Sequence, residues 1–188
     1  MTLQTRQLGS GFKRYLICAG AFSLAYFSFG FLLLRAYDLG FAAKDVVLLY
    51  ALFNFSCVPS ASLIGKLGDH FGRGPRLMSG YLGYAVMCVG VSLANARWRI
   101  FVIFVLYGIF YDIEDAQSKA FVTDLEPGRR ASAIGLYNFV TGLVYRPASL
   151  VAGALWLLHP IAAFAAAAGI SLFAFLAFVW LRPDRTQH

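Results

Sequence analysis

The sequence predicts an all-α integral membrane protein with six transmembrane helices. Of its 188 residues, 60% are hydrophobic and only 13% are charged, whereas a soluble domain carries about 25% charged residues. Several mostly apolar stretches reach the roughly 20 residues that a helix needs to cross a bilayer. Soluble classes are therefore excluded, and the net charge of +7 indicates basic loops at a membrane surface rather than a nucleic-acid partner.

The expected spans follow one another with short polar connections. The first has no charged residue, the second contains Asn54 and Pro59, and the fourth carries several charges. The fifth includes Arg146 and Pro147 and ends at the tight turn His159-Pro160. The spans are expected at residues 15–34, 46–64, 77–96, 100–122, 131–158 and 161–181, between polar tails at 1–14 and 182–188.

The distribution of Lys and Arg predicts the orientation. With the N-terminus in the cytoplasm, ten basic residues fall on the inner side and four on the outer side. The ten are Arg6, Lys13, Arg14, Lys66, Arg73, Arg76, Arg129, Arg130, Arg182 and Arg185, and the four are Arg35, Lys44, Arg97 and Arg99. Because basic residues favour the cytoplasmic side, both termini are expected there, in a bacterial inner membrane.

The loop between the second and third spans contains a recognisable motif. Gly65, Asp69, Gly72 and Arg73 give the pattern G-x-x-x-D-x-x-G-R. This resembles the signature loop between helices 2 and 3 in each six-helix half of the major facilitator superfamily, although His70 and Gly74 stand where that pattern has basic residues. Position and sidedness agree with the expected spans.

The resemblance extends over residues 22–181. The stretches "DAQSKAFVTDLEPGRRASAIGLYN" and "GLVYRPASLVAGALW" are similar to the C-terminal halves of bacterial members. It implies one bundle of 3+3 inverted repeats, which is half of a normal transporter. It also implies that the motif loop latches this bundle to a helix of a second bundle and releases it during a rocking cycle. The simpler alternative is a solvated turn that obeys the positive-inside rule.

The fourth span has a polar face. At about 100° per residue, one arc of about 160° holds Tyr107, Tyr111, Asp112, Glu114, Asp115, Ser118 and Lys119. An ionised side chain at mid-bilayer costs at least about 2.5 kcal/mol, so these carboxylates are expected to face a cavity, pair with cations or take up protons. Asp115 and Lys119 are four residues apart, which suits an ion pair with a helix-packing or gating role.

Other polar residues within the spans are candidates for coupling or substrate binding. Asp112 lies about 18 Å into a core about 30 Å thick, so Asp112 or Glu114 is expected to carry a coupling proton or contact a cationic substrate. The alternative is a solvated face near the cytoplasmic mouth. Arg146 either snorkels outward or reaches a substrate anion, and Asn138 is either a packing residue or a ligand.

The leading functional hypothesis is a half-sized secondary transporter that works by alternating access. It would need a second six-helix bundle, as a homodimer or with a separate half, and a small solute or ion as substrate. No phosphate-binding G-x-x-x-x-G-K-[ST] motif occurs, and a proton or ion gradient is expected to drive transport. A non-transporting membrane protein is the alternative. An enzyme is not expected, and neither a metal nor a cofactor is predicted.

Overall fold

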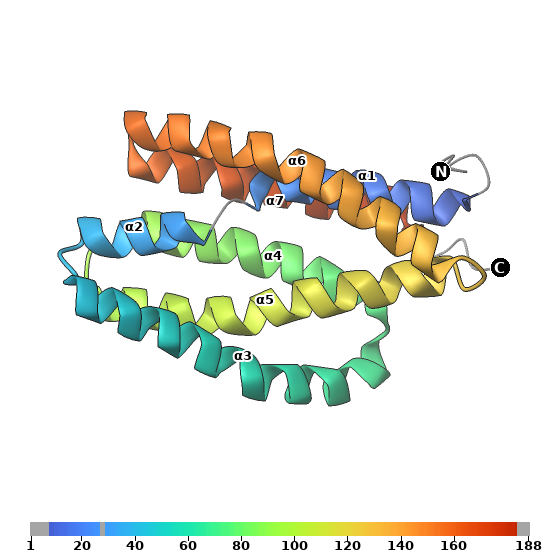
Figure 1. Cartoon of the computed structure of the whole chain (residues 1–188), viewed down its shortest axis with the longest axis horizontal. Helices are drawn as coiled ribbons and strands as arrows, with labels where there is room; N and C mark the ends of the chain where they lie inside the picture. Colours follow the sequence, from blue (N-terminus) through green and yellow to red (C-terminus); the bar gives the residue numbers. More distant parts are fainter. Residues whose placement is uncertain (1–7, 27–28, 184–188) are drawn as a thin grey trace.

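The computed structural model describes residues 8–26 and 29–183, apart from the side chains of residues 59–71 and 112–114. Its described residues are almost all helical, which confirms the predicted all-α class. The helices are α1 (Ser10–Ala25), α2 (Gly30–Asp38), α3 (Ala43–Phe71), α4 (Arg73–Ser92), α5 (Arg97–Leu125), α6 (Arg130–Leu158) and α7 (Pro160–Leu181). They run roughly parallel to the long axis of the molecule (Figure 1).

The stretch predicted as one helix over residues 15–34 contains two. It is α1 and α2 in succession: α1 ends at Ala25, and the backbone of the next residue, Tyr26, is non-helical. The Tyr84 hydroxyl donates a hydrogen bond of 3.1 Å to the carbonyl of Ala25, an end-of-helix carbonyl that lacks an intrahelical partner. In a membrane such a group needs a protein partner, so α4 stabilises the end of α1.

The helices pack in a paired pattern. α4 lies along α7, α3 and α4 both pack on α5, and α1 packs on both α6 and α7. In Figure 1, α1, α6 and α7 form an upper group and α2 to α5 a lower group, and the contact of α4 with α7 joins the two. The connection from α6 to α7 is the predicted turn, in which His159 Nδ1 accepts a hydrogen bond of 3.2 Å from the N–H of Ile161.

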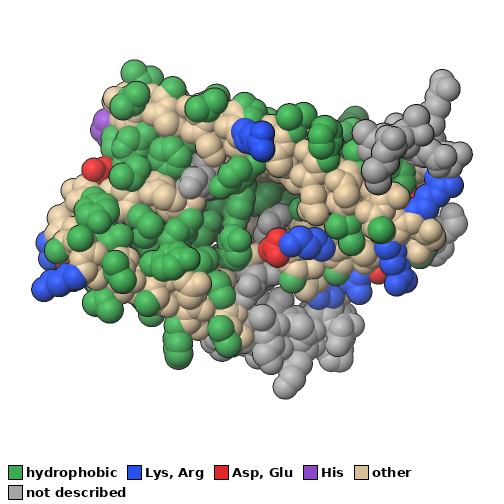
Figure 2. Space-filling model, viewed as in Figure 1, with side chains coloured by type: hydrophobic (Ala, Val, Ile, Leu, Met, Phe, Trp, Pro, Cys, Tyr) green, Lys and Arg blue, Asp and Glu red, His purple; other side chains and the backbone are tan. Residues whose placement is uncertain are grey.

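Three helical segments among the described residues are long and apolar enough to cross a membrane: Ser10–Asp38, which joins α1 and α2, Arg130–Leu158 and Pro160–Leu181. Figure 2 shows hydrophobic side chains along the molecule and Lys and Arg gathered mainly at the end where α4 begins and α5 ends. The start of α1 lies at the same end as the last turn of α7, because Arg14 donates a hydrogen bond of 3.4 Å to the carbonyl of Leu181.

The motif loop is shorter than the sequence indicated. α3 continues as a helix to Phe71, and α4 begins at Arg73. Gly72 alone separates them, with φ of 73°, in the left-handed region where glycine is favoured. The turn between α3 and α4 therefore rests on Gly72, whereas the motif residue Gly65 falls within α3 and Gly74 within α4.

Candidate functional site

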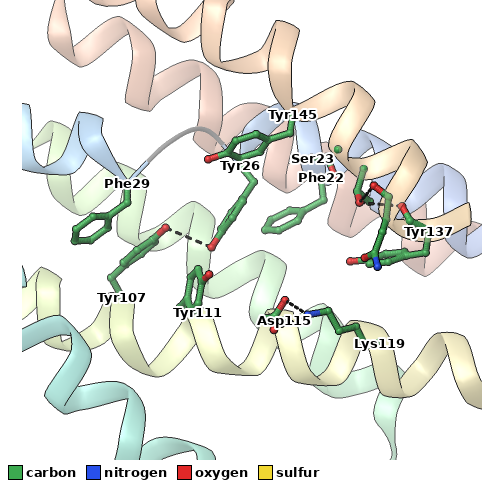
Figure 3. Close-up of a pocket in the computed structure, with 13 residues that line it drawn as sticks. Phe22, Ser23, Tyr26, Phe29, Tyr107, Tyr111, Asp115, Lys119, Tyr137 and Tyr145 are labelled. Atoms are coloured by element: carbon green, nitrogen blue, oxygen red, sulfur yellow. Dashed lines mark hydrogen bonds and ion pairs between the residues drawn. The ribbon is translucent and has the colours of Figure 1, made fainter. Parts of the chain in front are cut away.

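A cavity of about 460 Å³ lies between α1, α5 and α6. Figure 2 shows it as a hollow on one face of the molecule, and Figure 3 shows the side chains that surround it. Its lining contains seven aromatic residues, one ion pair and a few small polar groups. The lining residues are Phe22, Ser23, Tyr26, Phe29, Tyr107, Tyr111, Asp115, Lys119, Tyr137, Asn138, Thr141, Gly142 and Tyr145.

One wall of the cavity comes from α5. Tyr107, Tyr111, Asp115 and Lys119 recur every four residues, so they share one face of the helix, and all four line the cavity. The Asp115 carboxylate forms an ion pair of 2.7 Å with Lys119 Nζ. The side chain of Asp115 is 53% exposed and that of Lys119 is 46% exposed. The predicted ion pair of Asp115 with Lys119 is present. Four of the seven residues predicted on the polar face line the cavity, whereas Ser118 is buried. Figure 3 shows the pair on α5 beside Tyr111.

An aromatic cluster forms the end of the cavity that lies away from Lys119. The Tyr107 hydroxyl donates a hydrogen bond of 3.4 Å to the Tyr26 hydroxyl. The ring centroids of Tyr26 and Tyr111 lie 6.3 Å apart, and those of Phe29 and Tyr107 lie 5.5 Å apart in a stacked arrangement. Tyr26 and Phe29 flank the interruption between α1 and α2, so this interruption places aromatic rings beside the cavity (Figure 3).

The opposite wall comes from α6, and Asn138 is its one residue that the sequence predicted as a candidate. Asn138 was expected as a candidate and does line the cavity, together with Tyr137, Thr141 and Tyr145. Thr141 donates a hydrogen bond of 2.8 Å to the backbone carbonyl of Tyr137, which satisfies its hydroxyl within the helix. The spacing of these residues at three to four positions is the same signal that identified the polar face of the fourth span.

The remaining candidates have different positions. Arg146 is exposed on α6 and is not among the described residues that line the cavity. The structure therefore does not bring it to this site. Asp112 and Glu114 belong to α5, and their side chains lie outside the described residues. The same holds for the side chain of Asp69 in the motif.

The described basic residues of the motif region contact α5 of the same chain. Arg73 Nη1 lies 2.6 Å from the carboxylate of Asp124 and donates a hydrogen bond of 2.7 Å to the carbonyl of Ala120. Arg76 donates a hydrogen bond of 2.9 Å to the side-chain carbonyl of Gln117. The start of α4 is thus attached to the last turns of α5, about half a turn to two and a half turns beyond the cavity residue Asp115. A contact of this region with another bundle stays a prediction.

Comparison with known proteins agrees with the motif. The family model for the Major Facilitator Superfamily matches residues 15–188. An uncharacterised transporter of this type from Methanocaldococcus jannaschii is 32% identical over 162 residues, which cover 82% of this chain and 41% of that protein. The class C tetracycline resistance protein of Escherichia coli is 32% identical over 128 residues, covering 66% of this chain and 31% of that protein.

The chain therefore spans less than half the length of these curated relatives. The resemblance to C-terminal halves in particular stays a prediction. The motif at Gly72 and Arg73, the helical architecture and the family match over nearly the whole chain agree with one another, and together they show an integral membrane protein of a transporter family. The chain belongs to the major facilitator superfamily.

Proposed function

We propose that this chain is one six-helix bundle of a secondary active transporter, which moves a small solute by alternating access. The observation that carries the proposal is the cavity, which opens on one face of an apolar bundle. The ion pair in its lining, Asp115 with Lys119, is about half exposed to solvent. A face with ionised groups is unfavourable against lipid. A second bundle, from a second copy of the chain or a separate half, would cover this face. The enclosed cavity would then be the substrate pathway.

The packing pattern supports six spans arranged as 3+3 inverted repeats. The first repeat would have three spans: α1 and α2 counted together, then α3, then α4. The second repeat would be α5, α6 and α7. Equivalent pairs of spans should then make equivalent contacts. The contact of α3 with α5 corresponds to that of α6 with α1, and the contact of α4 with α5 corresponds to that of α7 with α1. The third helices of the two repeats, α4 and α7, pack on each other.

The charge distribution supports an orientation with both termini cytoplasmic, and the proposed location is the bacterial inner membrane. Arg14, Arg73 and Arg76 lie at one end of the bundle. There Arg14 of α1 contacts α7, and Arg73 and Arg76 of α4 contact α5. Basic residues near the ends of spans favour the cytoplasmic side. The motif region would then contact the second bundle from inside the cell.

A proton or ion gradient would drive the cycle, as a symporter or an antiporter. Asp115 is the described carboxylate of the cavity, and Asp112 and Glu114 precede it on α5. A positioned carboxylate is a group that can accept and release a proton, so these three residues are the candidates for coupling.

The test is solute flux in vesicles that contain the purified chain and a trapped pH-sensitive dye. We expect flux that depends on a proton gradient, with Asp115→Asn or Asp112→Asn reducing it at least about tenfold, the lower end of what a positioned proton-transfer group contributes. Asp38→Asn is the matched control, because Asp38 is an exposed carboxylate at the end of α2 and does not line the cavity. Flux that Asp38→Asn lowers as much as Asp115→Asn would contradict a role for the cavity.

The second candidate is a non-transporting membrane protein, such as the partner subunit of a transporter. It is favoured by the half-exposed pair of Asp115 and Lys119, because a subunit could present this face to a separate bundle. If the chain stays monomeric in a bilayer and moves no solute alone, the partner-subunit function is upheld, and flux should then appear only when a second bundle is supplied.

A further inference from the structure

The chemistry of the cavity wall changes in order along α5. Tyr107 and Tyr111 present aromatic rings, Asp115 follows one turn later with a carboxylate, and Lys119 comes last. Asp115 therefore lies between the aromatic part of the cavity and the ammonium group of Lys119, as Figure 3 shows. A ligand that fills the aromatic part meets the carboxylate before it meets the ammonium group.

Aromatic faces and a carboxylate attract the same kind of ligand. The face of an aromatic ring is electron-rich, and cations bind over it. Rings of Tyr26, Phe29, Tyr107 and Tyr111 gather within centroid distances of 5.5 to 6.3 Å. These rings offer an anion no cationic partner, and an anion that fills this part of the cavity would reach Lys119 only beyond Asp115.

The described cavity already holds one cation, which belongs to the protein. Lys119 Nζ lies 2.7 Å from Asp115, and both side chains are about half exposed. An exposed pair of this spacing is weak, because water and salt screen it. A ligand that gains ring contacts as well as the carboxylate can therefore displace Lys119.

We propose that the cavity binds an organic cation with an apolar or aromatic body, and that Lys119 is a tethered competitor that occupies Asp115 until the ligand arrives. The volume of about 460 Å³ lies within the range of small-molecule sites, about 300–1,000 Å³. This inference rests on the proposed role of the cavity as the substrate site. It adds the class of ligand and the role of the lysine.

Equilibrium binding of radiolabelled tetraphenylphosphonium to the full chain in lipid nanodiscs tests the proposal. Asp115→Asn removes the carboxylate charge, and we expect the Kd to rise about tenfold, the scale of one charged contact. Lys119→Met keeps the length of the side chain and removes the competitor. We expect its Kd to fall by about twofold or more.

The opposite signs separate competition from a structural role. If the pair only holds the helix together, both variants should weaken binding, and that result would overturn the proposal. Tyr111→Leu should weaken binding about fivefold, because a ring contact with a cation is lost. Tyr37→Leu should leave it unchanged, because Tyr37 is 47% exposed on α2 and does not line the cavity.

Tetraphenylborate has the same shape and the opposite charge. Tighter binding of this anion, lost in Lys119→Met, would show an anion site and overturn the inference. Cation binding without flux would uphold the inference and contradict the proposed transport. Flux of another solute with no cation binding would contradict the inference alone.

Discussion

The guanidinium group of Arg73 makes two contacts with α5, an ion pair with Asp124 and a hydrogen bond to the carbonyl of Ala120. Its side chain is 38% exposed and that of Asp124 is 42% exposed, so the ion pair contributes at most about 1 kcal/mol. The hydrogen bond adds about 1 kcal/mol. We expect Arg73→Ala to lower the Tm in detergent by about 2–8 °C, since a loss of about 1–2 kcal/mol is expected and 1 kcal/mol corresponds to about 2–4 °C for a chain of this size.

Asp124→Asn serves as the comparison for Arg73→Ala, because it removes the ion pair and leaves the bond from Arg73 to Ala120. Its Tm should fall by about half as much, measured by the same thermal unfolding assay. Equal losses in the two variants would mean that the carbonyl contact contributes nothing, which contradicts the geometry of 2.7 Å.

At the scale of residues, the sequence predicted the face of α5 better than its partners. Tyr107, Tyr111, Asp115 and Lys119 could be placed together because helical spacing is a property of one segment. The wall from α6 depended on the same signal, yet its residues other than Asn138 are small or aromatic and resemble packing residues. The contact of Arg73 with Asp124 joins residues 51 positions apart in the chain, and no local pattern carries that information.

At the scale of elements, α3 and α5 approach each other closely at Gly108. A Cβ atom there would lie 2.7 Å from the backbone oxygen of Phe53 and 2.8 Å from Cβ of Ser56, which is closer than such atoms can approach. Cys57 also donates a hydrogen bond of 3.5 Å to the Gly108 carbonyl. We expect Gly108→Ala to destabilise the bundle by about 1–3 kcal/mol, as overpacking does. The decrease of the Tm, measured by thermal unfolding in detergent, tests this prediction.

Gly135→Ala on α6 is the matched control for Gly108→Ala. Nothing lies within 4 Å of a Cβ atom at Gly135, so the added methyl group should stabilise the helix by about 0.5–1 kcal/mol. The two variants make the same chemical change in a helix and should shift the Tm in opposite directions. If both raise it, α3 and α5 do not approach at Gly108 as described.

Element boundaries could be predicted where composition changes and not where packing decides. The turn at His159 and Pro160 follows from the sequence, because proline is favoured at the first position of a helix. The interruption between α1 and α2 has no proline to mark it. It depends on Tyr26 and Phe29, whose rings contact α3, α4 and α5, and on the bond from Tyr84 to Ala25.

At the scale of the whole molecule, the cavity opens on a face that an isolated bundle would present to lipid. Asp115 and Lys119 are about half exposed there, and a lipid surface disfavours them. In a symmetric homodimer the same patch of each subunit forms the interface, so the two cavities would face each other.

Two exposed glycines provide a matched test of the homodimer. Gly142 lines the cavity on α6, Gly169 lies on α7 away from it, and a Cβ atom at either would have no neighbour within 4 Å. We expect Gly142→Cys to give a covalent dimer with a short bis-maleimide in membranes, and Gly169→Cys to give none. Both variants also carry Cys57→Ala, because Cys57 is partly exposed and could react with the cross-linker, whereas Cys18 and Cys88 are buried. A dimer through Gly169 alone would place the interface on α7, whereas no dimer with either would leave a separate half as the source of the second bundle.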